Sequence, residues 1–297
     1  MDTKTNTRAA IAGVHVVTTG TGAQHHEHRY GTQKPLMWWV LTSRSWVELP
    51  INAYLIEHRD GLVLFDTGLD PAIASDPDYI DSALGRFLLG RIFRLHIGPE
   101  DGLSRRLESM GFDAADVHTA VISHLHFDHI GGIADIPQAE LLVSEAEWQQ
   151  LSGPHPEHDW ILREHIELPG AKWTPVRHAP IDDPLVEIFG GGHDVMGDGS
   201  MILLPTPGHT VGSQSMLVRS EGMPPTLLVG DLTYELDLLM ADQVPGIGDF
   251  DQLRASFAKV RELRKRLPDL VVLPAHDSAA GSTQGASSNV ATAPSVV

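Results

Sequence analysis

The sequence predicts an α/β protein, an αββα sandwich in which two mixed β-sheets pack face to face between outer layers of helices. Three observations favour this architecture. Short runs of apolar and β-branched residues recur over most of the 297 positions, and amphipathic helical patterns lie between the runs. The patterned region also has the length of one large domain or two modest ones.

Nine runs predict strands, and several are apolar enough to be buried on both faces of a sheet. In chain order they cover residues 15–20, 52–58, 62–68, 119–124, 139–144, 201–206, 213–220, 226–231 and 270–276. Strands that run on either side of helical segments favour two packed sheets with helices outside them.

The clearest helical pattern lies at residues 250–266, FDQLRASFAKVRELRKR. Its apolar residues form one stripe, and we interpret the opposite charged face as solvated. Asp249 is placed to cap the start of this helix, and Pro268 to end it. The stripe consists of Phe250, Leu253, Phe257, Val260 and Leu263.

Residues 79–97, YIDSALGRFLLGRIFRLHI, form a second helical pattern with more apolar residues than a surface helix needs. We interpret it as a helix buried against the core or against a dimer partner. The alternatives are a lid over the active site and a helix that lies on a membrane surface. A homodimer is accordingly one expectation for this chain.

Neither end of the sequence carries a targeting or membrane signal. The first residues are polar, and no stretch approaches the ~20 apolar residues of a membrane span. We therefore expect a cytoplasmic protein without a stable membrane anchor. Residues 279–297 are small and polar, which predicts a flexible tail after a single domain of residues 1–278.

The composition restricts both the partners and the metal chemistry. A formal net charge of −18, with 21 basic against 39 acidic residues, argues against nucleic acid as a partner and against polyanionic substrates. The chain contains 17 histidines and no cysteine, so any metal must be held by nitrogen and oxygen atoms.

The stretch SHLHFDHIGG at residues 123–132 places three histidines and an aspartate directly after an apolar run. If the strand ends near Ser123, His124 and His126 point to the same side, because side chains alternate along a strand. Asp128 and His129 then lie on the following loop, where they are placed for a second ion. A catalytic zinc needs only three protein ligands, so four candidates are too many for one metal.

Three more candidates each follow an apolar run: His209, Asp231 and His276. A lone histidine or aspartate at the end of a strand is more often a turn residue than a ligand. We assign these three as candidate ligands only because strand ends gather along one edge of a sandwich. There they would lie close to the candidate ligands at residues 124–129.

The motifs HLHFDH, PGHTVGS, GD and PAHD resemble those of the metallo-β-lactamase superfamily, and LFDTG at residues 64–68 matches a further element. The resemblance covers roughly residues 50–277 and implies the αββα fold with two metal ions. It assigns one metal to His124, His126 and His209 and the other to Asp128, His129 and His276, with Asp231 bridging them. Asp66 would orient a ligand by a hydrogen bond rather than bind metal.

Smaller features resemble the N-acyl-homoserine lactonases within this superfamily. The enzymes that cleave β-lactams use a cysteine ligand, which this chain lacks, whereas Tyr234 follows Asp231 at the spacing where the lactonases place a substrate-binding tyrosine. The alternative for Tyr234 is a packed aromatic ring with its hydroxyl at the surface.

The N-terminal segment 24–49 is rich in tryptophan, methionine and leucine. In lactonase relatives an equivalent loop lines an acyl pocket, so the resemblance suggests that this one contacts a fatty chain; a core or dimer contact is the alternative. We interpret the nearby His25, His26 and His28 as exposed spectators rather than a third metal site. The pocket candidates are Met37, Trp38, Trp39 and Trp46.

The function that the resemblance implies is quorum quenching by a dinuclear lactonase. A metal-bridging hydroxide attacks the lactone carbonyl, Tyr234 stabilises the oxyanion, and Asp128 protonates the leaving alkoxide. Zinc is the first expectation for the metal, with manganese, iron and cobalt as alternatives. The alternative functions are a thioesterase of the glyoxalase II type, another ester or phosphotriester hydrolase, and a silent metal-binding scaffold.

Overall fold

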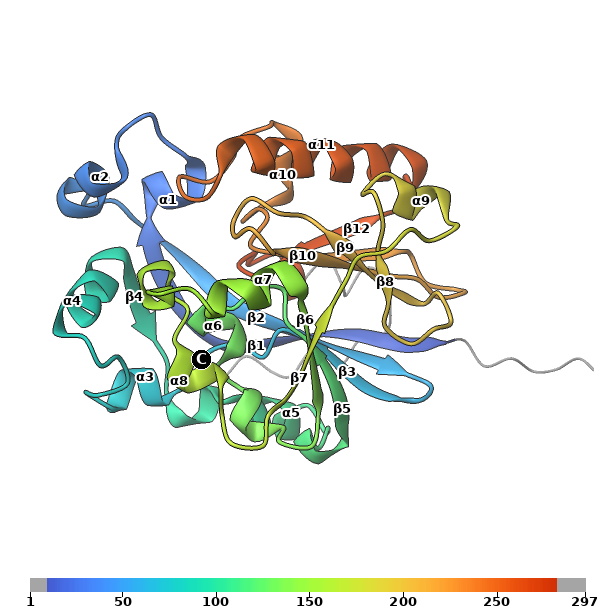
Figure 1. Cartoon of the computed structure of the whole chain (residues 1–297), viewed down its shortest axis with the longest axis horizontal. Helices are drawn as coiled ribbons and strands as arrows, with labels where there is room; N and C mark the ends of the chain where they lie inside the picture. Colours follow the sequence, from blue (N-terminus) through green and yellow to red (C-terminus); the bar gives the residue numbers. More distant parts are fainter. Residues whose placement is uncertain (1–9, 282–297) are drawn as a thin grey trace, which may run out of the picture.

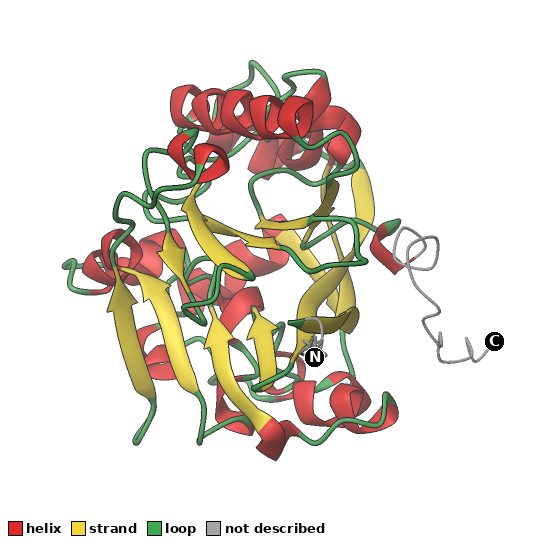
Figure 2. Ribbon diagram, turned by 90° about the vertical axis from the view of Figure 1, so that its right-hand side faces the viewer, coloured by secondary structure: helices red, strands yellow, loops and turns green. Residues whose placement is uncertain are grey.

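The computed structural model describes residues 10–281 and contains two β-sheets that pack against each other, with helices on their outer faces (Figures 1 and 2). The first sheet has seven strands in the order β4-β1-β2-β3-β5-β6-β7. Strands β4 to β3 in this order pair antiparallel, and β3 to β7 pair parallel, so the sheet is mixed. Its strands are β1 (Ile11–His25), β2 (Trp46–His58), β3 (Gly61–Phe65), β4 (Phe93–His96), β5 (Val117–Val121), β6 (Glu140–Ser144) and β7 (Lys172–Val176).

The second sheet has five strands in the order β12-β11-β10-β9-β8 and is also mixed, because only β11 and β12 pair parallel. Its strands are β8 (His193–Asp194), β9 (Met201–Pro205), β10 (Gln214–Val218), β11 (Thr226–Gly230) and β12 (Val271–Pro274). The predicted fold class, an αββα sandwich of two mixed sheets, is confirmed.

The helices are mostly short, and α11 is the longest of those described. They are α1 (His26–Tyr30), α2 (Leu36–Thr42), α3 (Ala72–Ser75), α4 (Ala83–Ile92), α5 (Leu103–Ser109), α6 (Phe127–Ile130), α7 (Glu145–Leu151), α8 (Arg163–Ile166), α9 (Pro184–Glu187), α10 (Leu236–Met240) and α11 (Phe250–Arg266). Four 3-10 turns lie at Pro99–Asp101, Ala114–Asp116, Ile133–Asp135 and Pro156–Asp159. Among the described residues, we find no helix with the length and hydropathy needed to cross a bilayer.

Alternation of side chains along the strands builds the core in layers. In β2, Tyr54 and Ile56 face the second sheet, while Leu55 between them faces the helical layer that includes α5. In β9, Leu203 faces the first sheet, and Leu204 packs with α11. Strands buried on both faces in this way have few polar residues, which is why their sequences are apolar without interruption.

Helix α11 confirms the prediction for residues 250–266 at both ends. The Asp249 carboxylate accepts hydrogen bonds from the backbone N–H groups of Asp251 and Gln252, and the helix ends two residues before Pro268. Of the predicted apolar stripe, only Phe250 is exposed, because it lies in the first turn beyond the edge of the sheet contact. The other four residues are buried against the second sheet.

The single helix predicted at residues 79–97 is wrong in two respects. Helix α4 covers only Ala83–Ile92, and the chain then forms strand β4, whose backbone pairs with Thr21–Gln24 of β1. Pairing with the long β1 overrides the helical pattern here. No residue of α4 is buried, so the expected burial of this helix against the core is not found.

Several boundaries also differ from the sequence prediction. The segment 24–49 is not a loop: it contains the end of β1, α1, α2 and the start of β2. Strands β7 and β8 were not predicted, because β7 is interrupted by Pro175 and β8 has only two residues. The packed region extends beyond residue 278, since Ala280 is buried between the sheets. The rest of the predicted tail, residues 282–297, lies outside the described residues.

Candidate metal centre

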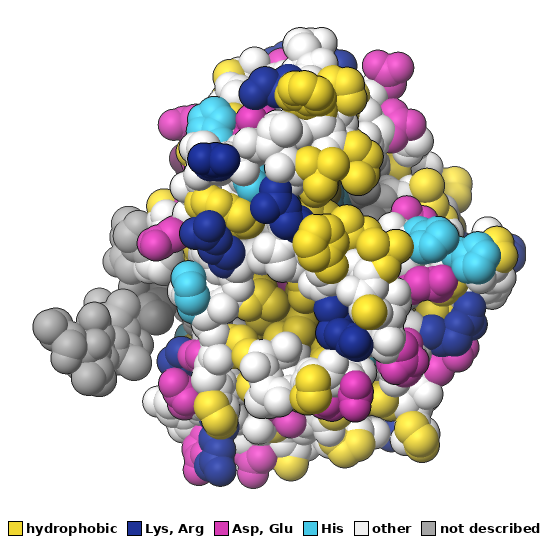
Figure 3. Space-filling model, turned by 90° about the vertical axis from the view of Figure 1, so that its left-hand side faces the viewer, with side chains coloured by type: hydrophobic (Ala, Val, Ile, Leu, Met, Phe, Trp, Pro, Cys, Tyr) yellow, Lys and Arg dark blue, Asp and Glu magenta, His cyan; other side chains and the backbone are white. Residues whose placement is uncertain are grey.

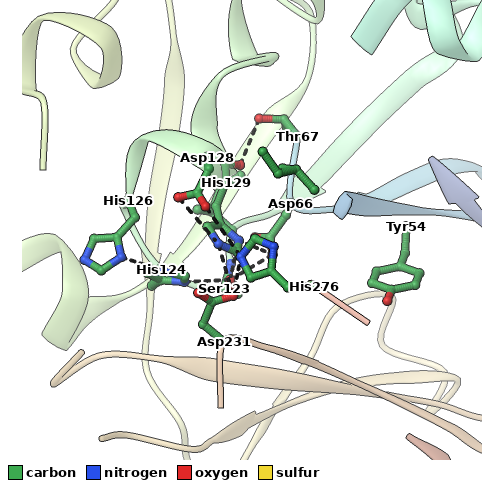
Figure 4. Close-up of polar contacts among 12 residues, drawn as sticks. Tyr54, Asp66, Thr67, Ser123, His124, His126, Asp128, His129, Asp231 and His276 are labelled. Atoms are coloured by element: carbon green, nitrogen blue, oxygen red, sulfur yellow. Dashed lines mark hydrogen bonds and ion pairs between the residues drawn. The ribbon is translucent and has the colours of Figure 1, made fainter. Parts of the chain in front are cut away.

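Seven histidine and aspartate side chains from four segments of the chain converge on one site, and Figure 4 labels all of them except His209. The first segment follows β5 and includes helix α6, the second follows β9, and the third and fourth begin directly after β11 and β12. All seven are the residues predicted from the sequence: His124, His126, Asp128, His129, His209, Asp231 and His276.

The route by which His124 and His126 meet differs from the prediction. Strand β5 ends at Val121, so both histidines lie in a loop, and alternation along a strand does not explain their position. The loop nevertheless places His124 Nε2 3.0 Å from His126 Nδ1. His209 completes this group, with its Nε2 3.1 Å from His126 Nδ1.

Asp128, His129 and His276 form a second group next to the first. Asp128 and His129 belong to helix α6 rather than to a loop. His276 Nε2 lies 3.5 Å from Asp128 Oδ2, and His129 Nε2 lies 3.8 Å from Asp128 Oδ1. The side chains point toward one another from opposite sides of the site (Figure 4).

Asp231 lies between the two groups and directs one carboxylate oxygen to each. Its Oδ1 is 3.2 Å from His276 Nε2 and 3.3 Å from His129 Nε2. Its Oδ2 is 3.6 Å from His209 Nε2. A carboxylate in this position is able to ligate an ion in each group at once.

Hydrogen bonds on the outer side of two rings decide which nitrogen faces the site. The Nδ1 atoms of His129 and His276 lie 2.9 Å from Asp66 Oδ2 and 2.9 Å from the backbone oxygen of Pro50, both of which only accept. These Nδ1 atoms must therefore carry the hydrogens. In neutral rings the Nε2 lone pairs then face the interior of the site, as metal-binding histidines require.

The donor set fits divalent cations better than it fits an arrangement of hydrogen bonds. His129 Nε2 and Asp231 Oδ1 are buried and have no hydrogen-bond partner. Lone pairs that face carboxylate oxygens repel each other unless a positive charge lies between them. Burial lowers the pKa of His276, but the carboxylates of Asp231 and Asp128 outweigh it and raise that pKa to about 10. The site thus attracts positive charge.

Asp66 orients His129, as the sequence analysis expected of this residue. Besides the bond to His129 Nδ1, its carboxylate accepts hydrogen bonds from the backbone N–H and the hydroxyl of Ser123 at 2.7 and 2.8 Å. Asp66 adopts a φ of 62°, in the left-handed region that non-glycine residues rarely occupy. This backbone strain sits where it positions a candidate ligand.

Gly131 allows the backbone after α6 to pack closely against the loop that follows Asp66. A Cβ atom at Gly131 would lie 2.1 Å from the backbone nitrogen of Asp70. The N–H of Gly131 donates to the backbone oxygen of Gly68 at 2.8 Å. The glycine therefore keeps α6, with Asp128 and His129, close to the segment that carries Asp66.

Glu147 is a buried carboxylate beside the candidate ligands that the sequence motifs did not indicate. It is fully buried and accepts hydrogen bonds from the backbone N–H of Leu125 at 3.0 Å and of Gly212 at 3.1 Å, and from the hydroxyl of Thr210 at 2.7 Å. Leu125 lies between His124 and His126, and Thr210 follows His209. One carboxylate thus holds together the two loops that carry the first ligand group.

Replacement of Glu147 by glutamine should weaken metal binding about 10- to 100-fold, the usual effect of losing a bond that orients ligands. The amide would direct N–H groups at donors that now meet a carboxylate oxygen. Competition with a chromophoric chelator measures the affinity, and Glu145→Gln is the matched control, because Glu145 lies on the same helix and pairs with Arg177 instead of the ligand loops. Unchanged affinity in Glu147→Gln would show that Glu147 acts on stability alone.

Tyr234 lies beside the candidate metal ligands and is buried, not exposed. Its ring stacks on that of His276 with centroids 5.6 Å apart, and its hydroxyl lies 2.9 Å from His28 Nε2. The alternative that left this hydroxyl at the surface is therefore wrong. His28 is also buried, contrary to its interpretation as an exposed spectator. His25 is buried as well, and only His26 is exposed.

A cavity of about 420 Å³ opens above the seven residues, with Tyr234 in its wall. Of the four pocket candidates in segment 24–49, only Trp39 lines it. Met37 and Trp38 point to solvent from α2, and Trp46 lies between the ring of His25 and the guanidinium of Arg94. The apolar wall consists of Leu36, Trp39, Ile92, Phe93, Phe127, Trp160, Val211 and Ile247.

Comparison with known proteins gives the same picture over most of the chain. A sequence profile described as the Metallo-beta-lactamase superfamily matches residues 46–276. The protein named N-acyl homoserine lactonase AttM from Rhizobium johnstonii is 33% identical over 246 residues, which cover 80% of this chain and 85% of that protein. Its namesake from Agrobacterium fabrum is 32% identical over 77% of this chain and 82% of its own.

Solved structures resemble the fold. The crystal structure of an N-acyl homoserine lactone hydrolase with the product N-hexanoyl-L-homoserine at its catalytic metal centre aligns with a TM-score of 0.73. The alignment covers 92% of this chain and 96% of the other, at 22% identity.

Proposed function

The chain belongs to the metallo-β-lactamase superfamily, and we propose that within it this protein opens the lactone ring of N-acyl-homoserine lactones by metal-dependent hydrolysis. The relatives from Rhizobium and Agrobacterium carry the name of this activity, which supports the proposal. The cavity supports it independently.

The chemistry of the cavity is the observation that carries the proposal. Five of the seven candidate metal ligands line it together with Tyr234, and much of its wall is apolar. No lysine or arginine occurs among the described residues that line it. The anionic groups of a glutathione thioester or of a charged phosphate ester would find no basic side chain there, whereas an uncharged lactone with an acyl chain needs none.

We assign the seven residues to two divalent cations, and zinc is the first expectation for their identity. The first cation would take His124, His126 and His209, and the second Asp128, His129 and His276, with Asp231 shared. When bound, such cations make water nucleophilic near neutral pH and place positive charge beside the scissile carbonyl. Manganese, iron and cobalt suit the same nitrogen and oxygen donors.

Tyr234 serves as the hydrogen-bond donor to the carbonyl oxygen. Burial and the carboxylates of Asp231 and Asp128 raise the pKa of its phenol well above the usual value. The hydroxyl therefore keeps its proton at every pH at which the enzyme works. A neutral donor fixed beside the reacting carbon stabilises the negative charge that develops on the carbonyl oxygen.

His28 fixes the direction in which the phenol donates. Burial lowers the pKa of His28 to about 3, so the ring is neutral and carries one hydrogen. Its Nδ1 has no hydrogen-bond partner, and a buried lone pair costs less there than a buried N–H would. The hydrogen therefore lies on Nε2 and is donated to the Tyr234 oxygen, which leaves the phenol proton free to reach the substrate.

Asp128 carries the proton. It lines the cavity, and although burial raises its pKa, His129 and His276 hold it at about 2, so it enters the reaction as a carboxylate. It accepts the proton that the attacking water loses. The same proton passes to the alkoxide oxygen when the C–O bond of the ring breaks, which yields the open N-acyl-homoserine.

Replacement of His28 by phenylalanine should lower kcat about fivefold, the usual effect of one lost hydrogen bond. The same change in a Tyr234→Phe background should have no further effect on kcat, because the phenol that His28 orients is absent. His28→Gln should restore much of the loss, and His26→Gln is the control. An equal loss in both backgrounds would mean that His28 acts on something other than Tyr234.

A substrate panel tests the proposed function. Metal-loaded protein is given an N-acyl-homoserine lactone, S-lactoylglutathione and a neutral phosphotriester, and proton release is followed with and without a chelator. We expect the lactone to be opened with the highest kcat/KM and the activity to vanish on chelation. A higher kcat/KM for either of the other substrates would replace the lactonase assignment.

A further inference from the structure

The exposed large apolar side chains of this protein gather on two neighbouring helices. Of the nine that the described residues expose, six belong to α2 and α4: Leu36, Met37, Trp38, Leu41, Leu84 and Phe87. Trp38 and Leu84 are 63% and 66% exposed. We call these six residues the α2/α4 face; Figure 3 views the side of the molecule on which α2 and α4 lie, where apolar groups gather with lysines and arginines among them.

The two helices contact each other but leave this face uncovered. The Arg91 guanidinium of α4 donates to the backbone oxygens of Val40 and Leu41 in α2, at 3.1 and 2.6 Å. No residue of α4 is buried, although eight of its ten residues are apolar or glycine. Contiguous apolar surface of this kind usually marks a site of interaction.

The charge around the face differs from that of the rest of the chain. Residues 28–47 and 82–98 contain none of the 39 acidic residues of the sequence. They contain six basic residues, and four of these are exposed. The exposed ones are Lys34, Arg44, Arg86 and Arg94. Lys34 pairs with Glu27 at 3.0 Å, so in a chain of net charge −18 the local positive charge beside the apolar residues rests on Arg44, Arg86 and Arg94.

We propose that the α2/α4 face docks on a lipid bilayer that contains anionic lipid. Exposed leucine, phenylalanine and tryptophan side chains enter the boundary between headgroups and acyl chains, where tryptophan is favoured. Arg44, Arg86 and Arg94 face the anionic headgroups, and Lys34 does so while paired with Glu27. The acidic remainder of the protein is repelled by the same surface, so the docked orientation is defined.

A second copy of the chain fits this face less well. A two-fold interface brings the same surface of each copy together. The basic residues of the acid-free segments in one copy would then face the same basic residues in the other. Nothing acidic within these segments would compensate them. A bilayer that contains anionic lipid matches both the exposed apolar side chains of the face and the exposed cations beside them.

The docked orientation has a consequence for the cavity. Leu36 belongs to the α2/α4 face and also lines the cavity, as does Ile92 at the end of α4. The cavity mouth therefore lies at the edge of the docked face. An amphiphile dissolved in the bilayer would reach it without crossing bulk water. The docking itself does not rest on the proposed lactonase activity and is measured without any substrate.

Co-sedimentation with vesicles tests the proposal on the metal-loaded full chain. One set of vesicles is phosphatidylcholine, and the other is an equal mixture of phosphatidylcholine and phosphatidylglycerol. We expect binding to the anionic vesicles to be at least about tenfold tighter, and to weaken as salt is raised. Absence of binding, or equal binding to both sets, would overturn the proposal.

Two pairs of substitutions locate the docked surface. Trp38→Ser with Phe87→Ser should lower the affinity for anionic vesicles about tenfold, as should Lys34→Glu with Arg44→Glu. The matched controls are Met240→Ser with Phe250→Ser, and Arg105→Glu with Lys265→Glu, all at exposed positions outside the face. An equal loss in the controls contradicts the assignment of the face.

Sedimentation equilibrium separates the bilayer from a second copy. The chain should be monomeric in solution, with or without the Trp38 and Phe87 substitutions. A dimer that these substitutions dissociate would make the face an interface between copies and would overturn the proposal.

Discussion

Replacing Asp231 by asparagine should abolish most of the hydrolytic activity, with kcat/KM falling on the order of a thousandfold. Asp231 is the one carboxylate among the described residues that lies between both ligand groups, 3.2 Å from His276 Nε2 and 3.6 Å from His209 Nε2. The amide removes a negative charge and directs N–H groups at ring lone pairs. The protein should therefore lose at least one of its two equivalents of metal.

Metal analysis and steady-state kinetics measure the two effects on the same preparation. Asp237→Asn is the matched control, because it makes the same substitution at an exposed position six residues further along. It should keep both the metal and the activity. If Asp231→Asn retained two equivalents of metal and its turnover, the shared position assigned to Asp231 would be wrong.

Tyr234→Phe should lower kcat by one to three orders of magnitude while leaving the metal content unchanged. The upper part of this range corresponds to about 2.7 to 4 kcal/mol, the effect of removing a good donor to an oxyanion elsewhere. The ring would still stack on His276, so the pocket keeps its shape. The change removes the hydroxyl, and with it the proposed hydrogen bond to the reacting carbonyl and the bond that His28 Nε2 donates to the phenol oxygen.

Kinetics with an N-acyl-homoserine lactone check this expectation, and kcat and KM are determined separately. Tyr30→Phe is the control, since its hydroxyl lies near the site but bonds Glu235 at 3.3 Å. Unchanged kcat in Tyr234→Phe would remove this tyrosine from the reaction and leave the metal centre as the only stabiliser of the oxyanion.

The fold was predictable from sequence where the hydropathy pattern of a segment matches its burial in the structure. Strands β9 and β11 are buried along all or nearly all of their length, so their sequences are mostly apolar runs that a surface element would not show. Helix α11 carries its own cap and stop signal. Strand β4 was not predictable, because its extended form depends on the backbone of β1, which lies some 70 residues earlier.

The candidate ligands were predictable from the crowding of His124, His126, Asp128 and His129, together with the resemblance that added the distant ligands. For Glu147, the sequence contains a pattern that predicts a hydrogen bond but not the partners found in the structure. Ser144 and Glu147 have the spacing of a capping box, and Ser144 does accept a bond from the Glu147 backbone. In a capping box the glutamate returns to its own helix, whereas here it bonds two other loops, and no local pattern encodes that.

His28 and the pocket wall depended on contacts that a sequence does not display. His28 reaches Tyr234 across 206 positions, and the ion pair between Arg29 and Glu235 at 2.8 Å holds the two segments together. Trp38 and Trp39 are neighbours, yet only Trp39 lines the cavity, because helix α2 turns successive side chains to different sides. That helix was not predicted, so the choice between them was not available.

The central claim is that seven side chains from four segments hold two divalent cations at the floor of the cavity. Anomalous diffraction from crystals grown with zinc, measured on both sides of the zinc absorption edge, tests it most directly. We expect two anomalous peaks, one among His124, His126 and His209 and one among Asp128, His129 and His276, with Asp231 in contact with both. A zinc-supplied crystal in which these side chains surround no anomalous peak would contradict the account.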